Sequence, residues 1–140
     1  MIALAAIDHV VFRVRDMGAM IAFYQSVFGA QVERRVDDLG LVQIRVGSAL
    51  VDLIDCADEL GLQGGAPPGR EGRNVDHVCF RVEPWDEDAI LSHLADHGFV
   101  DRDVGLRYGA QGFGPSIYVT DPEGNVLELK GPPDSSPDRV

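Results

Sequence analysis

The sequence predicts an α+β fold made of two βαβββ modules, and two repeated segments are the main reason. Residues 7–14 read IDHVVFRV and residues 75–82 read VDHVCFRV, which are identical at six of eight positions. Farther along each half, LVDLI at 50–54 is matched by VLELK at 126–130, and both segments carry a carboxylate in the middle. Repetition of two segments in the same order indicates a chain built from two copies of one unit.

The first module is expected over residues 7–55. The alternating run 7–14 predicts a strand, and Asp16 is placed to cap a helix that Gly29 ends. Three short strands rich in Val and Ile, separated by turn residues, are then expected at 30–37, 41–46 and 49–55.

The second module, expected over residues 75–130, repeats this order. A strand at 75–82 and a helix at 86–97, which stops at Gly98, open it. The three remaining strands are expected at 99–104, 116–120 and 126–130.

Three segments are predicted to have irregular structure. The connector at 56–74 holds five glycines and two prolines, a composition typical of loops. The glycine-rich segment 105–115 is expected to be a mobile loop, and the proline-rich tail at 131–140 is expected to be disordered.

Composition and charge restrict the partners of this chain. Its 140 residues, 45% of them hydrophobic, suffice for a single domain with a buried core. The net charge of −11 excludes nucleic acid, because phosphate binding needs a clustered positive surface. No apolar run is long enough to span a membrane, and the N-terminal segment lacks the features of a signal peptide. Since only two cysteines are present, a cytoplasmic protein with reduced thiols and a small-molecule partner is expected.

Strand alternation predicts the direction of four polar side chains. Successive residues of a strand point to opposite faces, so His9 and His77 point away from the helix-facing apolar positions. Asp52 and Glu128 likewise point away from their leucine neighbours. A buried carboxylate without a partner is destabilising by several kcal/mol, so each acid should have a cation, a donor network or a metal. These four residues are therefore candidate metal ligands, two in each half.

Two other repeated or recognisable features are expected to be structural. Arg13 and Arg81 occupy matching positions and should pair with acidic groups at strand ends. The segment DPEGN at 121–125 has the composition of a turn, with proline fixing one φ and glycine allowing a positive one.

Three segments give the chain its resemblance to a known family. They are DHVVF at 8–12, AFYQSVFG at 22–29 and YVTDPEGNVLEL at 118–129. In this order and spacing, the sequence resembles the vicinal oxygen chelate superfamily. That superfamily includes glyoxalase I, extradiol dioxygenases, methylmalonyl-CoA epimerase and fosfomycin-resistance enzymes. The resemblance implies two modules whose strands curl around a shared cleft, and a homodimer.

The resemblance also implies metal ligands on the first and last strands of each module. His9, His77 and Glu128 match the family pattern. Asp52 is shorter than the glutamate that glyoxalase-like members have there, so a His-His-Glu triad is the alternative to four ligands. Two imidazoles with one or two carboxylates suit Zn, Ni, Co, Mn or Fe(II).

The implied function is metal-assisted proton transfer on a small oxygenated molecule, of lyase or isomerase type. Glu128 is the candidate base, and Arg107 and Tyr108 are candidates for holding an anionic substrate. Epoxide opening of the fosfomycin type and ring cleavage at Fe(II) are the enzyme alternatives, and neither uses Asp52 as a ligand. A metal-free protein that sequesters a flat hydrophobic ligand, as bleomycin-resistance relatives do, is the alternative from another class.

Overall fold

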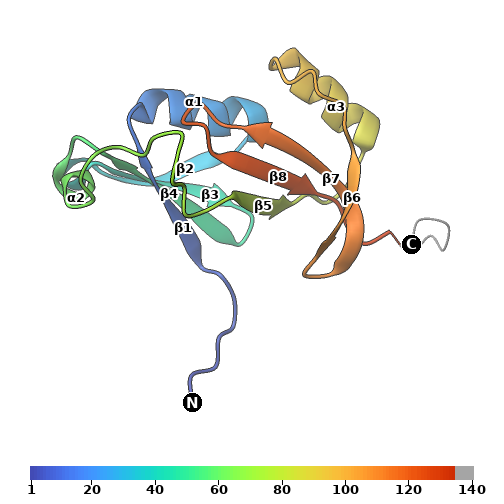
Figure 1. Ribbon diagram of the computed structural model, residues 1–140, viewed down its shortest axis with the longest axis horizontal. Helices are drawn as coiled ribbons and strands as arrows, with labels where there is room; N and C mark the ends of the chain where they lie inside the picture. Colours follow the sequence, from blue (N-terminus) through green and yellow to red (C-terminus); the bar gives the residue numbers. More distant parts are fainter. Residues whose placement is uncertain (135–140) are drawn as a thin grey trace. The chain divides into compact units, whose positions relative to one another are not determined.

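The chain divides into two compact units, and a computed structural model describes residues 1–134. Unit 1 spans Met1–Arg73 and unit 2 begins at Asn74. Each unit holds one four-stranded mixed sheet, with strand order β1-β4-β3-β2 in unit 1 and β5-β8-β7-β6 in unit 2 (Figure 1). The two orders correspond strand by strand, which confirms the predicted α+β fold of two βαβββ modules.

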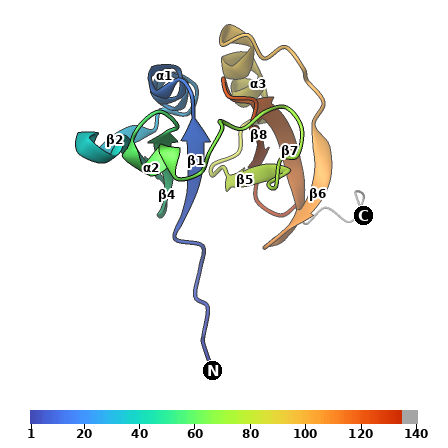
Figure 2. The same cartoon turned by 60° about the vertical axis from the view of Figure 1, so that its left-hand side comes forward.

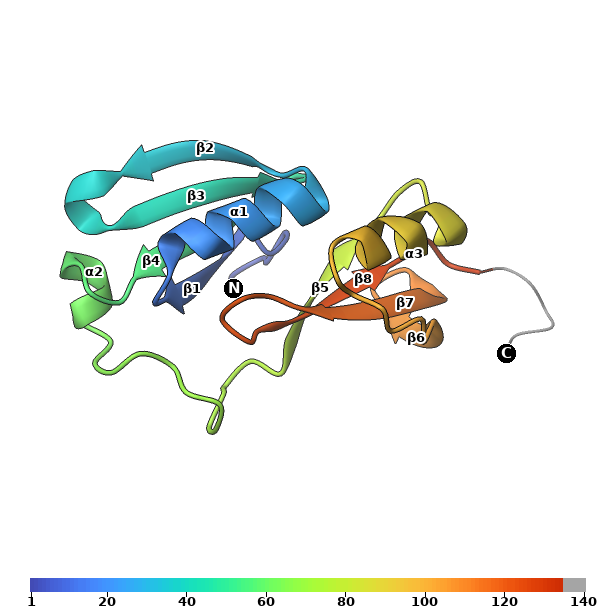
Figure 3. The same ribbon diagram turned by 90° about the horizontal axis from the view of Figure 1, so that it is seen from above.

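Unit 1 follows the predicted element order, with two short helical turns added. Its elements are β1 (His9–Val14), α1 (Met17–Phe28), β2 (Gln31–Val36), the 3-10 turn η1 (Asp37–Leu39), β3 (Leu41–Val46), β4 (Ala49–Asp55) and the single-turn α2 (Glu59–Leu62). Strand β1 pairs with β4 in parallel, whereas β3 pairs antiparallel with both β2 and β4. Helix α1 lies across one face of this sheet (Figure 3).

Helix α1 begins and ends where the sequence predicts. The carboxylate of Asp16 accepts a hydrogen bond from the backbone N–H of Ala19 at 2.9 Å. Gly29 adopts the left-handed conformation, with φ of 64°, and ends the helix. Met20 and Tyr24 are fully buried against the sheet, whose helix-facing side is apolar. The opposite face of the sheet carries the polar side chains.

Unit 2 has five main elements. They are β5 (His77–Arg81), α3 (Glu87–Asp96), β6 (Gly105–Gly109), β7 (Gly112–Thr120) and β8 (Val126–Lys130). Asp86 caps α3 by accepting from the N–H of Ala89 at 3.1 Å, and α3 lies against the unit 2 sheet (Figure 2). Leu94 of α3 is buried, as are Ile117 of β7 and Leu127 of β8.

Two predictions for unit 2 are wrong, those of a strand at 99–104 and of a mobile loop at 105–115. Residues 99–104 form no strand, and β6 instead begins at Gly105. Strands β6 and β7 form an antiparallel hairpin in which Gly109 pairs with Gly112. Its glycines serve a tight turn rather than a mobile loop, since Gly112 has a φ of 119°.

The connector between the units is held to β1 by Arg13. The Arg13 guanidinium donates to the carbonyl oxygens of Gly61, Gly65 and Ala66, at 2.8, 2.6 and 3.2 Å. The expected pairing of Arg13 with an acid is therefore wrong, because backbone carbonyls take its place. Arg81 does pair with an acid, Glu83, at 3.4 Å.

The start of the expected disordered tail is hydrogen-bonded to β7, although it forms no helix or strand. The N–H of Gly131 donates to the carbonyl of Pro115 at 2.8 Å, and that of Asp134 donates to the carbonyl of Phe113 at 2.8 Å. Residues 135–140 lie outside the described part of the chain. Within residues 1–134, no helix is long and apolar enough to cross a membrane.

Candidate functional site

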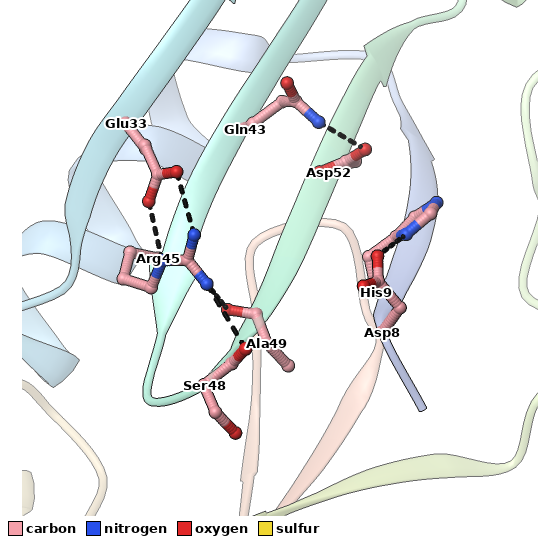
Figure 4. A network of polar contacts seen from close by, with 8 residues as sticks. All are labelled: Asp8, His9, Glu33, Gln43, Arg45, Ser48, Ala49 and Asp52. Carbon is pink, nitrogen blue, oxygen red and sulfur yellow. Dashed lines mark hydrogen bonds and ion pairs between the residues drawn. The ribbon is translucent and has the colours of Figure 1, made fainter. Parts of the chain in front are cut away.

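In unit 1 the structure brings His9 and Asp52 to the same face of the sheet. The parallel register pairs Val11 with Asp52, so His9 lies two residues along the neighbouring strand on the face away from α1. Asp52 is only 5% exposed. The side-chain amide of Gln43 donates to Asp52 Oδ2 at 2.9 Å (Figure 4). Asp52 Oδ1 is buried and has no hydrogen-bond partner among the described residues.

The orientation of the Gln43 amide is fixed from its other side. Arg34 of β2 donates to Gln43 Oε1 at 3.2 Å. Because the guanidinium can only donate, the Gln43 carbonyl faces Arg34 and the amide nitrogen faces Asp52. A chain of two hydrogen bonds therefore runs from β2 through β3 to the carboxylate on β4.

The preceding aspartate orients His9. His9 Nδ1 lies 2.6 Å from the Asp8 carboxylate. Figure 4 marks this contact with a dashed line. This hydrogen bond to Asp8 raises the pKa of His9, and the charge of Asp52 adds to the effect. With Nδ1 occupied by a carboxylate, Nε2 is the ring atom left to bind a ligand, as in carboxylate–histidine–metal arrangements.

In unit 2 the corresponding residues are in direct contact. His77 Nε2 lies 3.2 Å from Glu128 Oε2, and His77 Nδ1 lies 2.8 Å from Asp76. The fully buried hydroxyl of Ser116 donates to Glu128 Oε1 at 2.5 Å. Glu128 itself is 5% exposed. Two hydrogen bonds and the His77–Glu128 contact thus link four side chains, those of Asp76, His77, Glu128 and Ser116.

Two further side chains share the face of the unit 2 sheet that carries Glu128, although neither was among the candidate site residues predicted from the sequence. Cys79 is directly opposite Glu128 in the β5–β8 register. Although Cys79 is an exposed residue, partial desolvation of its thiol, reinforced by the charge of Glu128, raises the pKa of the thiol to about 11. The Tyr118 ring packs edge-on against His77, with ring centroids 5.7 Å apart. The same period of two that singled out His77 and Glu128 would have found both residues.

The two candidate substrate-binding residues lie on opposite faces of the unit 2 sheet. Arg107 pairs with Gly114 on β7, on the face that carries Glu128, and its guanidinium lies 6.0 Å from the centre of the Tyr118 ring. Tyr108 pairs with Phe113 on the other face, where the two rings are 5.1 Å apart. The geometry therefore brings Arg107, and not Tyr108, to the polar face.

Each unit thus presents an imidazole and a buried carboxylate side by side. Within either unit, no three His, Cys, Asp or Glu side chains of the described residues form a group that could hold a metal ion. The donor set nevertheless fits a divalent metal, because neutral imidazole and carboxylate oxygens are the ligands of Zn, Mn and Fe(II). The unpartnered Asp52 Oδ1 is the strongest sign of this fit, since a buried carboxylate oxygen requires a cation or a donor.

Comparison with known proteins identifies the family. A family model described as the Glyoxalase/Bleomycin resistance protein/Dioxygenase superfamily matches residues 6–129. The chain belongs to this superfamily. The sequence is also 30% identical over 131 residues to the glyoxalase domain-containing protein RDO1 of Mycosarcoma maydis, covering 91% of this chain and 69% of that protein.

Several solved structures share the fold of this chain. A protein from the mobile metagenome of V. pseudocholerae aligns with a TM-score of 0.75 and 22% identity, covering 96% of this chain and 99% of its own. Lactoylglutathione lyase from Agrobacterium tumefaciens aligns at 0.63 and 23%, covering 91% and 94%. The fosfomycin resistance protein FosX from Mesorhizobium loti aligns at 0.62 and 19%, covering 94% and 95%.

Proposed function

We propose that this protein is a metal-dependent enzyme of the glyoxalase type. It acts on a small oxygenated molecule by metal-assisted proton transfer, as a lyase or isomerase. His9, Asp52, His77 and Glu128 are the proposed ligands of a divalent ion, which is Zn, Ni, Co, Mn or Fe(II). Superfamily membership and the presence of a lyase among the structural neighbours support this class of reaction.

The observation that carries the proposal is the state of the Asp52 carboxylate. It is almost fully buried, one oxygen is held by Gln43, and the other has no hydrogen-bond partner in the described structure. Retaining a buried ionised group in this state is unfavourable for folding alone. A cation on the free oxygen explains it, and favours four ligands over the His-His-Glu alternative.

The proposed roles of the protein groups follow from their positions. A bound divalent cation supplies a Lewis acid that polarises a substrate carbonyl. Glu128 accepts the proton from the adjacent carbon at Oε2, which Ser116 does not bind and which lies 3.2 Å from His77 Nε2. Arg107, exposed on the same face as Glu128, pairs with an anionic group of the substrate. Tyr108 has no role in this mechanism, because it lies on the other face.

Metal analysis is the first test. Protein purified without an affinity tag is analysed for bound metal and titrated with Zn, Ni, Co, Mn and Fe(II), alongside the alanine variants of the four proposed ligands. We expect each variant to bind the metal more weakly. Full metal affinity in Asp52→Ala would favour the three-ligand enzymes, and absence of metal binding by the native protein would favour a metal-free binding protein.

Deuterium exchange is the second test. A panel of small α-hydroxycarbonyl compounds is incubated with the metal-loaded protein in D2O, and exchange at the carbon beside the carbonyl is followed by NMR. We expect exchange with at least one compound, and its loss in Glu128→Gln, which keeps the size of the side chain but removes the base. Equal exchange rates with Glu128→Gln would rule out Glu128 as the base.

The assembly and location form part of the same proposal. We propose a homodimer, as the family resemblance implies, and light scattering of the native protein tests it. The two free cysteines, Cys56 and Cys79, are consistent with a reducing compartment such as the cytoplasm.

A further inference from the structure

We propose that Ser116 and Gln43 are positioning residues that make each metal-binding carboxylate present a single oxygen. The inference rests on the proposed metal site. In both units a side chain from the adjoining antiparallel strand donates to one carboxylate oxygen, while the other oxygen receives no hydrogen bond from that strand among the described residues. Such partners of metal ligands fix the geometry of the ligand and tune its affinity.

In unit 2 the two carboxylate oxygens of Glu128 have different partners. Ser116 donates to Oε1 of Glu128, while Oε2 is the oxygen that faces His77 Nε2 at 3.2 Å. Because the Ser116 hydroxyl is fully buried, water does not compete for it. Glu128 is therefore held in one rotation, with Oε2 on the side of the histidine.

In unit 1 the same result arises through a different residue. Gln43 donates to Oδ2 of Asp52 and leaves Oδ1 without a partner among the described residues. Arg34 prevents the Gln43 amide from reversing, because a reversed amide would turn its NH2 group toward the guanidinium. Arg34 thus donates to Gln43, and Gln43 donates to Asp52, in one chain of hydrogen bonds.

The two donors are not copies of each other in the repeat. Gln43 is directly opposite Asp52 in the β3–β4 register. Ser116 is opposite Lys130, so it reaches Glu128 along the diagonal. The short aspartate is met by a long amide and the longer glutamate by a short hydroxyl. Different residues at different register positions thus produce the same pattern, in which the antiparallel strand holds one carboxylate oxygen and not the other.

The Ser116 arm of the test separates the hydroxyl from the volume of the side chain. Cobalt(II) alone is titrated into metal-free native protein and into Ser116→Ala, Ser116→Thr and Ser116→Val, with binding followed by visible absorption. Threonine and valine add the same bulk, and only threonine keeps the hydroxyl. We expect affinity to fall by roughly 10-fold or more in the alanine and valine variants and to stay near native in Ser116→Thr.

The Gln43 arm uses a matched residue on the neighbouring strand. Gln43→Met keeps the length of the side chain and removes the donor. Gln31→Met makes the same exchange at an exposed position, where the amide donates to the Gly29 carbonyl and to no carboxylate among the described residues. We expect roughly 10-fold weaker cobalt binding in Gln43→Met and no change in Gln31→Met. The absorption spectrum of bound cobalt should also change in Gln43→Met, because the free rotation of Asp52 alters the ligand geometry.

The outcomes distinguish this inference from the proposed function. Equal losses in Ser116→Thr and Ser116→Val would assign the effect to volume and overturn the positioning role of Ser116. Native affinity in Gln43→Met and Ser116→Ala, together with lost affinity in His9→Ala and His77→Ala, would overturn the inference and leave the metal site intact. A native protein that binds no cobalt would overturn both.

Discussion

Replacing Asp52 with leucine should stabilise the metal-free protein. The two side chains have the same branching, with two terminal atoms on Cγ, but leucine is the larger because methyl groups replace the oxygens. This extra bulk costs about 1–3 kcal/mol in a packed site. Asp52 is 5% exposed and shares its face with the half-buried Leu50 and Ile54. The substitution therefore removes a buried charge and adds apolar contacts at one position.

The expected size of the effect follows from the contacts of Asp52. Burial of an ion is destabilising by several kcal/mol, and the hydrogen bond from Gln43 offsets about 1.5–3 kcal/mol of this. A buried leucine side chain contributes about 1.5–3 kcal/mol. Gln43 is half-buried, so its released amide can turn to water. We expect a net gain of about 2 kcal/mol in the free energy of unfolding, or roughly 4–8 °C in Tm.

Urea unfolding followed by far-UV circular dichroism measures this difference, first with a chelator present. The same measurement in metal at about 100 times the native Kd should stabilise the native protein by about 2.7 kcal/mol and Asp52→Leu by much less. The stability advantage of the variant should then disappear. If metal-free Asp52→Leu is instead less stable than native by 2 kcal/mol or more, Asp52 is a structural carboxylate and the argument for a metal at Oδ1 fails.

Three further predictions concern single residues. Asp121 is 4% exposed and accepts hydrogen bonds from the N–H of Glu123, the N–H of Asn125 and the Asn125 side chain. Asp121→Ala should therefore lower the free energy of unfolding by about 3 kcal/mol in the same urea assay. An unchanged free energy of unfolding would contradict a structural role for Asp121. Asp8→Asn should lower the pKa of His9, measured from its imidazole NMR shifts, because the Asp8 hydrogen bond raises it. A histidine whose pKa is raised in the folded state stabilises the fold at pH values below its unfolded pKa, and this contribution is lost as the pH rises through the folded pKa. The difference in stability between the native protein and Asp8→Asn should therefore be larger at pH 5.5 than at pH 8.5. The Cys79 thiol, whose pKa is raised to about 11, should react with iodoacetamide more slowly at pH 8 than an ordinary thiol, with the rate still rising at pH 10. Reaction at the ordinary rate would contradict the partial desolvation of this thiol beside Glu128.

Local sequence signals predicted most of unit 1 because each depends on a few neighbouring residues. The cap at Asp16 and the left-handed Gly29 bound α1 where expected. The alternation of side chains along each strand also placed His9 and Asp52 on the face away from the helix, because residues two positions apart lie on the same face whatever the strand pairing. The fold class followed from the repeat, which records the same topology twice.

Contacts between strands were harder to predict, because register is set by partners distant in sequence. The partners of the carboxylates, Gln43 and Ser116, depend on how β3 and β7 align with their neighbours. The face of Tyr108 depends on the β6–β7 hairpin, where a shift of one residue would exchange it with Arg107. Glycines in that hairpin resembled a loop because a tight turn and a mobile segment have the same composition.

The binding of Arg13 to the connector divides that segment into a part that tolerates engineering and a part that does not. A Cβ on Gly61 would overlap the carbonyl of Asp55, and one on Gly64 would overlap the Arg13 guanidinium. The same addition at Gly69 meets no atom within 4 Å. A cysteine or an inserted peptide at residue 69 therefore offers an attachment point for a spectroscopic label, and a label there would report on the protein without loosening the Arg13 contacts.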